Sequence, residues 1–237
     1  MPKLPITKEN IDFYLKELAK EFRKRSGKSV PAEIILIGGA SVLINYGFRE
    51  VTYDMDAMIS ASSAMKDAIN VVGDKYGLPV GWLNDDFIKT TSYSPRIISV
   101  SKYYRTYFNI VTFRTVTGAY LAAMKLMSGR QYKYDRSDVI GILWEHEKAG
   151  EPLTLEMIKK AVSELYGSYG VLADDVKEFI EHVMNEGNYE EIYTRVRRAE
   201  AENRENLIEY QNEKPGAIQP DNVNDIIAAL RRRKSSL

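Results

Sequence analysis

The chain has 237 residues, of which 44% are hydrophobic, so it can bury a core as one large domain or two small ones and is not a disordered chain. Its 33 Lys and Arg residues balance 33 Asp and Glu residues, so no global charge points to nucleic acid or a membrane surface. The absence of cysteine excludes disulfides, thiolate catalysis and cysteine metal sites. The charged N-terminal segment and the lack of a run of about 18 apolar residues predict a cytoplasmic protein with no membrane partner.

The first predicted element is an amphipathic helix. Apolar residues recur at helical spacing from residue 11 to residue 22, with charged residues on the other face. Thr7 is the expected N-cap, and Gly27 is expected to end the helix. This helix should pack as a cover on an apolar surface.

A short apolar strand and a glycine turn follow. Residues 33–37 read as a central strand covered on both faces, and Gly38 and Gly39 lie directly after it. A short helix over residues 41–46 should begin at this turn. Free backbone N–H groups at a helix N-terminus bind phosphate oxygens well, and the missing Cβ lets a ligand approach. The alternative is a tight strand-to-helix turn that binds nothing.

Residues 51–59 alternate between apolar and polar side chains, which predicts a strand. Asp54 and Asp56, two residues apart, should point to the same face. Two neighbouring carboxylates repel each other unless a cation lies between them. Mg²⁺ prefers oxygen ligands and is usually held by one or two carboxylates together with substrate phosphates. An Asp-x-Asp alone is weak evidence, but its position after the glycine turn favours a phosphate and metal site.

The next segments complete the α/β part of the chain. Residues 63–76 are expected to form a helix, and residues 97–100 and 107–116 are expected to form strands because they are rich in β-branched and aromatic residues.

From Thr117 onward the pattern is helical. Four amphipathic helices are expected: one starts near Thr117, the second at Asp135 or Ser137, and the others near Thr154 and Leu172. Residues after 189 are charge-dense, which favours a solvated helical tail ending in the basic cluster 231–234; a docking helix or a weak phosphate contact is the alternative. The predicted division is an α/β domain over 1–116, a helical domain over 117–188 and a charged tail over 189–237.

Two blocks of the sequence resemble a known family. The strand, Gly-Gly/Ser turn, helix and Asp-x-Asp strand resemble the signature of the nucleotidyltransferase superfamily with the DNA polymerase β-like fold. The stretch TVTGAYLAAMKLMSGRQYKYDRSDVIGIL resembles the Lys-x-x-x-x-Arg-x-x-x-x-Asp-x-x-Asp segment of the AbiEii-type toxin branch, which includes the DUF6036 group. The similarity runs from about residue 34 to residue 147.

The resemblance implies an α/β (α+β) fold, with a small mixed-sheet nucleotidyltransferase domain followed by a helical domain. It also implies site residues: Gly38, Gly39 and Ser41 for the triphosphate, Asp54 and Asp56 for Mg²⁺, Lys125 for phosphate oxygens, and Arg130, Asp135 and Asp138 to complete the pocket, with Asp54, Asp56, Lys125 and Asp138 as the catalytic set. From the residues alone, Lys125 interrupts an apolar helix face and either reaches inward or snorkels to solvent. Arg130, Asp135 and Asp138 could equally be a capping and ion-pair cluster at a helix corner.

One departure from the family concerns the third acid that many members place on a neighbouring strand. The sequence offers Asn109 there, and an amide cannot take a proton at pH 7. Other acids that could substitute are Asp85, Asp86, Asp135 and Asp138. Otherwise transfer is slow, or the protein binds nucleotide without catalysis.

The predicted function is Mg²⁺-dependent transfer of NMP from a nucleoside triphosphate to an acceptor, or a non-catalytic nucleotide-binding or regulatory module that keeps the fold. The tyrosine-rich clusters at 103–107 and 132–134 could stack on an RNA acceptor such as tRNA, but ordinary surface packing is the favoured interpretation. A protein hydroxyl is the other acceptor considered, and a toxin–antitoxin role would add a cognate antitoxin as partner.

Overall fold

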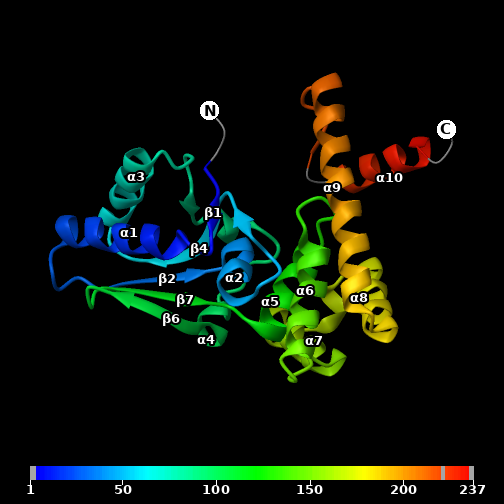
Figure 1. Ribbon diagram of the computed structural model, residues 1–237, viewed down its shortest axis with the longest axis horizontal. Coiled ribbons are helices and arrows are strands. Elements are labelled where there is room, and N and C mark those ends of the chain that lie inside the picture. Colours follow the sequence, from blue (N-terminus) through cyan, green and yellow to red (C-terminus); the bar gives the residue numbers. More distant parts are fainter. Residues whose placement is uncertain (1–3, 220–221, 235–237) are drawn as a thin grey trace.

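The computed structural model describes residues 4–219 and 222–234 of the chain. Figure 1 shows an α/β part built on one twisted sheet and a helical part that follows it in the sequence. This is the α+β organisation predicted above. Within the described ranges, no helix has the length and apolar character needed to cross a membrane.

A five-stranded mixed sheet is the frame of the α/β part. Its strand order is β5-β4-β2-β7-β6, with β2 antiparallel to β4 and parallel to β7. The strands are β2 (Ala32–Leu36), β4 (Met55–Ser60), β5 (Leu83–Asn84), β6 (Lys102–Tyr107) and β7 (Val111–Thr115). A separate two-stranded pair joins β1 (Ile6–Thr7) to β3 (Val51–Thr52). The central position of β2 explains its continuous apolar run, because both of its faces are covered.

Two helices, α1 (Ile11–Ser26) and α3 (Ala64–Tyr76), cover one face of the sheet (Figure 1). Their apolar stripes share one core with Leu36, Met55 and Phe113. The N-terminus of α1 differs from the prediction. Thr7 lies in β1 and donates its backbone N–H to the Asn10 side chain, so Asn10 rather than Thr7 occupies the cap position.

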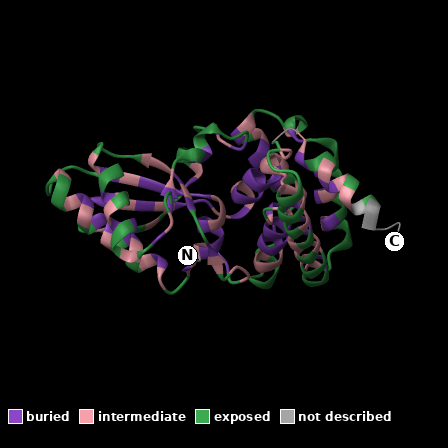
Figure 2. Ribbon diagram, turned by 90° about the horizontal axis from the view of Figure 1, so that it is seen from above, coloured by how far each residue is buried: buried purple, intermediate pink, exposed green. Residues whose placement is uncertain are grey.

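The opposite face of the sheet packs toward the helical half. Ile35, Ile37 and Val116 belong to the same core as the helices of that half, and this core continues through it. Figure 2 shows buried residues both along the strands and in the helices beside them. The two halves are therefore packed as one body around residues that follow directly on β2 and β7.

The strand predicted over residues 51–59 is two strands with a bend between them. The Thr52 hydroxyl donates to the Asp54 carbonyl at 2.9 Å, and Tyr53 and Asp54 leave the strand conformation. As a result Asp54 is exposed just before β4, whereas Asp56 lies within β4. The bend lets β3 pair with β1 while β4 pairs with β2.

Two further strand predictions were wrong in detail. Residues 97–100 form one helical turn, α4 (Ile97–Val100), in which Ile97 is buried and Ile98 is exposed. The segment 107–116 contains a hairpin turn, because Phe108 and Asn109 have φ values of 55° and 56°. Asparagine tolerates this left-handed conformation better than most residues.

The hairpin moves Asn109 away from the place assigned to it by the sequence. β7 runs parallel to β2, and Val111 pairs with Ala32 at the start of β2. Gly38 follows the other end of β2. Asn109 therefore lies at the opposite end of the sheet from the glycine turn and cannot replace a third acid there.

The helical half contains α5 (Gly118–Ser128), α6 (Asp135–Lys148), α7 (Leu155–Tyr166) and α8 (Asp174–Glu186). All four predicted helices are present. Thr154 caps α7 by accepting the Met157 N–H, and Gly129 ends α5 in the left-handed conformation. Short 3-10 turns at Asp86–Lys89 and Tyr169–Val171 complete the connections.

The charge-dense segment forms α9 (Tyr189–Glu213), followed by α10 (Val223–Lys234). The helix was expected, but it is not solvated on all sides, because Ile192, Glu200, Asn203 and Leu207 are buried. Figure 1 shows α9 running beside α6, and α10 packs against the C-terminal half of α9 through Leu207. Of the basic cluster 231–234, the side chains of Arg231, Arg233 and Lys234 lie outside the described residues.

Candidate functional site

The glycine turn lies where strand β2 ends and α2 (Gly38–Asn45) begins. Gly38 has a φ of 57°, a conformation that glycine adopts without strain. An added Cβ at Gly38 would lie 3.5 Å from the Asp56 carboxylate oxygen Oδ2. The structure thus places the carboxylate of Asp56 directly against the first turn of α2, where backbone N–H groups are available to an anion.

Asp56 is held in an unfavourable electrostatic environment. Burial raises its pKa, and the neighbouring charge of Asp54 raises it further. The charges of Arg130, Lys133 and Lys125 lower it, though not enough to offset the two raising effects. An additional cation at the two carboxylates would relieve the repulsion, and both supply only oxygen donors, as Mg²⁺ prefers.

The third acid remains missing from the sheet. On β7, the residue whose side chain shares the Asp56 face is Arg114, which pairs with Ile35 of β2. Its guanidinium donates to the side chain and backbone of Ser101. Asp86 is exposed and paired with Lys89 at 2.8 Å. Within residues 4–219 and 222–234, no group of three or more His, Cys, Asp or Glu side chains could hold a metal ion.

Ser41 does not face the turn. Its hydroxyl is fully buried, donates to the Leu36 carbonyl at 2.6 Å and accepts the Val116 N–H at 3.2 Å. These bonds tie α2 to the ends of β2 and β7. The assignment of Ser41 to the triphosphate therefore does not fit its position, and its role is to hold the turn.

Lys125 reaches inward from α5, as its apolar neighbours suggested, but it meets carboxylates. Its ammonium lies 2.9 Å from Asp135 and 2.8 Å from Asp138, and Lys125 is only 6% exposed. Burial lowers the pKa of Lys125, but the two carboxylates raise it by more. Burial likewise raises the pKa of Asp135, yet Lys125 and Arg130 bring it down to about 2. Lys125, Arg130 and Asp135 are therefore charged at neutral pH.

Arg49 is a site residue that the sequence did not reveal. Its Nη1 lies 2.7 Å from the Asp138 carboxylate, and its Nε donates to the Val51 carbonyl. An added Cβ at Gly39 would lie 2.9 Å from Arg49 Nη2, so the guanidinium lies directly over that glycine. Arg49 links the glycine turn to the cluster of Asp138 and Lys125.

The remaining cations come from the segment between α5 and α6. Arg130 donates through Nε to Asp135 at 2.8 Å and is 37% exposed. Lys133 is exposed, and the charges of Arg130 and Lys133 both act on Asp56. The site therefore has two carboxylates and three cations, Arg49, Arg130 and Lys133, around the start of α2.

The two tyrosine-rich clusters have different positions. Tyr104 and Tyr107 donate to Asp12 of α1, and Arg105 pairs with the same residue at 2.8 Å, so this cluster fixes α1 on β6. In the second cluster, the charge of Lys133 acts on Asp56 and lowers its pKa.

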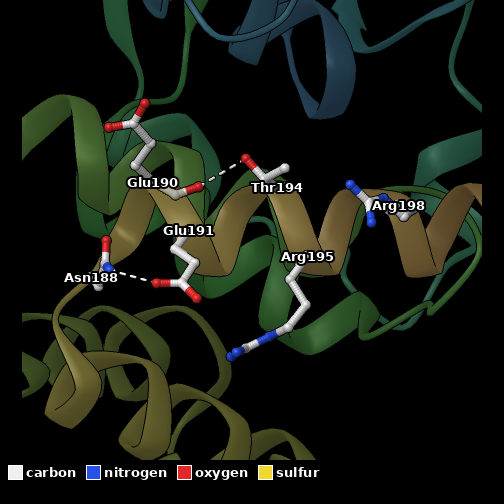
Figure 3. Close-up of a pocket in the computed structure, with 6 residues that line it drawn as sticks. All are labelled: Asn188, Glu190, Glu191, Thr194, Arg195 and Arg198. Carbon is white, nitrogen blue, oxygen red and sulfur yellow. Dashed lines mark hydrogen bonds between the residues drawn. The ribbon is translucent and has the colours of Figure 1, made fainter.

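A surface hollow along the first turns of α9 is separate from these residues (Figure 3). Asn188 donates to Glu191 at 2.8 Å, and Thr194 donates to the Glu190 carbonyl. Arg195 pairs with Glu186. None of the residues that line this hollow belongs to the predicted site.

The structure places a glycine turn at the start of α2 beside Asp56 of β4, the arrangement expected of nucleotidyltransferase-like proteins. The family described as nucleotidyltransferases of unknown function (DUF6036) matches residues 13–143. Because this match spans more than half of the 237 residues, the chain belongs to that family. No curated protein and no solved structure matched the chain.

A buried glutamate outside the matched segment contacts the same cluster. Glu200 of α9 is 2% exposed, and its two carboxylate oxygens accept the backbone N–H groups of Arg136 and Ser137 at 3.0 and 3.2 Å. Burial raises its pKa, the bonds from Ser137 and Arg136 lower it, and the charge of Asp138 raises it, with a net value of about 7. In the sequence, Glu200 looks like any other acid of a charged helix.

The raised pKa of Glu200 predicts a pH-dependent stability. Between the ordinary value of 4.5 and about 7, the folded protein retains a proton that the unfolded chain has lost, so stability falls as pH rises through this window. The full loss is about 3 kcal/mol. We expect Glu200→Gln to reduce the difference in unfolding free energy between pH 5 and pH 8 by most of this amount, measured by urea denaturation.

The raised pKa of Asp56 also makes stability fall as pH rises, but this effect is present in both the wild type and Glu200→Gln and cancels when the two are compared. Glu202→Gln, an exposed change on the same helix, is the control and should leave the pH profile unchanged. A Glu200→Gln profile parallel to that of the wild type would contradict the assignment.

Proposed function

We propose that this protein transfers NMP from a nucleoside triphosphate to an acceptor hydroxyl, with Mg²⁺ held by Asp54 and Asp56. The observation that carries the proposal is the position of the Asp56 carboxylate, whose Oδ2 would lie 3.5 Å from a Cβ added at Gly38, the first residue of α2. The membership of the chain in the family of nucleotidyltransferases of unknown function supports the proposal.

In this proposal, some residues of the chain would bind phosphate oxygens, and others would hold those residues in place. The N–H groups that begin α2 and the guanidinium of Arg49 would bind phosphate oxygens beside Gly39. Arg130 and Lys133 would bind further phosphate oxygens from the opposite segment. Bound Mg²⁺ would neutralise charge on the triphosphate and polarise the α-phosphate. Lys125, Asp135 and Asp138 form the charged cluster that holds Arg49 and Arg130 in place.

In the transfer, the acceptor oxygen forms a bond to the α-phosphorus, and the bond from that phosphorus to the bridging oxygen breaks. Pyrophosphate leaves with the electron pair, and the acceptor's proton passes to solvent, since β7 contributes no carboxylate at this face. Catalysis would consist of positioning and charge stabilisation. The resemblance to AbiEii-type toxins extends the proposal to tRNA or a protein hydroxyl as acceptor and to a cognate antitoxin as partner.

The second candidate is a nucleotide-binding or regulatory module without turnover. The specific observation that favours it is Arg114 on β7, at the face where family members place an acid, with its guanidinium held by Ser101. This module would use the same turn and the same cations but would not transfer the nucleotide.

The deciding experiment uses labelled NTPs, Mg²⁺, and either total RNA or cell extract. We expect the wild type to transfer label and Asp54→Asn and Asp56→Asn to lose transfer. Both changes remove a repulsive charge, so folding should be unimpaired. Asp67→Asn, at an exposed acid of α3, is the matched control.

Calorimetry separates the two candidates. NTP binding without transfer to any acceptor in the RNA or extract would support the non-catalytic module. Absence of NTP binding with and without Mg²⁺ would contradict both candidates.

A further inference from the structure

Helix α9 contacts both segments that carry the cations of the candidate site, although it lies outside the family match to residues 13–143. One segment is 46–50, with Arg49. The other is 129–138, with Arg130 and Lys133. Both are irregular connections at their cation-bearing positions, so their positions depend on what packs against them.

The contact with the second segment begins at the N-terminus of α6. The residue before α6, Tyr134, has a φ of 65° and provides no side-chain cap. Glu200 supplies the missing acceptors from α9, since its carboxylate binds the N–H groups of Arg136 and Ser137. A negative carboxylate at this position also interacts favourably with the positive end of the α6 helix dipole.

Two further α9 residues hold the same segment. The Arg197 guanidinium carbon lies 3.6 Å from the centre of the Tyr134 ring, and Nη1 lies 3.8 Å from an oxygen of Asp138. Asn203 is 2% exposed and donates to the Gln131 carbonyl at 2.8 Å. These contacts involve residues on both sides of Lys133, including Tyr134 with its left-handed backbone.

The contact with the first segment is made by Tyr193. Its hydroxyl donates to the Phe48 carbonyl at 3.1 Å, and the two rings meet edge to face at 5.6 Å. The Phe48 ring in turn fills the space over Gly141 of α6, where an added Cβ would lie 2.6 Å from it. Phe48 is thus fixed on both sides, one residue before Arg49.

The four residues Tyr193, Arg197, Glu200 and Asn203 are spaced by four, three and three, so they lie on one face of α9. Resting on the proposed function, we propose that this face of α9 positions Arg49, Arg130 and Lys133 for the triphosphate, with Tyr193 and Glu200 as positioning residues. The proposed effect of the helix is on the geometry of the cations.

The test combines hydrogen exchange with nucleotide binding on the full chain. We expect Glu200→Ala to increase amide exchange in residues 129–138 and Tyr193→Phe to increase it in residues 46–50. We also expect each variant to weaken binding of the NTP that the wild type binds best among ATP, GTP, CTP and UTP with Mg²⁺, by about tenfold. Glu202→Ala is the matched control and should change neither quantity.

The variant Ile180→Val distinguishes a positioning role from a general loss of stability. It removes one methylene group from a buried core residue of α8 and so lowers stability without changing α9 or the two segments. Its folded molecules should bind NTP as the wild type does. Glu200→Gln keeps one acceptor oxygen and should restore part of the lost affinity.

Unchanged exchange in both segments would overturn the inference, as would increased exchange with unchanged NTP affinity. If the wild type binds none of the four NTPs, the proposed function fails, and the exchange measurements alone decide whether α9 holds the two segments.

Discussion

Replacing Lys125 with methionine should lower the free energy of unfolding by about 3–5 kcal/mol, the usual cost of removing one partner from a buried ion pair. The ammonium of Lys125 lies between Asp135 and Asp138, and all three side chains are almost completely buried. Methionine matches the length of lysine, so the change removes a charge while leaving little cavity. Urea denaturation at neutral pH would measure the loss.

The control is Lys133→Met, which removes the same charge from an exposed position and should change stability by no more than about 0.5 kcal/mol. The two changes distinguish the roles of two lysines that both act on Asp56. A Lys125→Met protein with wild-type stability and lost NTP affinity would show that Lys125 binds phosphate directly, as the family motif first suggested.

The sequence predicted the parts of the site that depend on local pattern. The apolar run of β2, the two glycines and the alternation around Asp56 are periodic or compositional signals, and they lie together in the structure. The spacing of Lys125, Arg130, Asp135 and Asp138 also indicated one cluster. In the structure these residues form ion pairs with one another. Such pairing depends on the distance between α5 and α6, which the spacing of residues along the sequence does not reveal.

The missed features depend on contacts between distant segments. Arg49 follows an aromatic residue in a loop without periodicity, and its importance comes from Asp138, 89 residues away. The hairpin at Asn109 lies within a run of β-branched and aromatic residues that contains no glycine or proline, so the run was read as one strand. The asparagine itself was the available signal, because it tolerates the left-handed region.

Gly39→Ala should destabilise the protein by about 1–3 kcal/mol and weaken NTP binding at least tenfold, or about 1.4 kcal/mol. Alanine is a better helix former than glycine, which alone would stabilise α2 by up to about 1 kcal/mol. The added Cβ, however, would lie 2.9 Å from Arg49 Nη2 and 2.9 Å from Thr52 Oγ1. Arg49 cannot move away cheaply, because Asp138 and the Val51 carbonyl hold its guanidinium.

The matched control is Gly47→Ala, in the loop that follows α2. Its added Cβ would meet only Glu145, at 3.7 Å or more, so neither stability nor NTP affinity should change appreciably. The comparison isolates the contact with Arg49 from the general effect of replacing a glycine. A Gly39→Ala protein that is more stable than the wild type and binds NTP normally would show that the guanidinium is not fixed over the turn. Weaker binding together with lower stability would show that position 39 requires glycine because the side chain of Arg49 occupies the space of a Cβ.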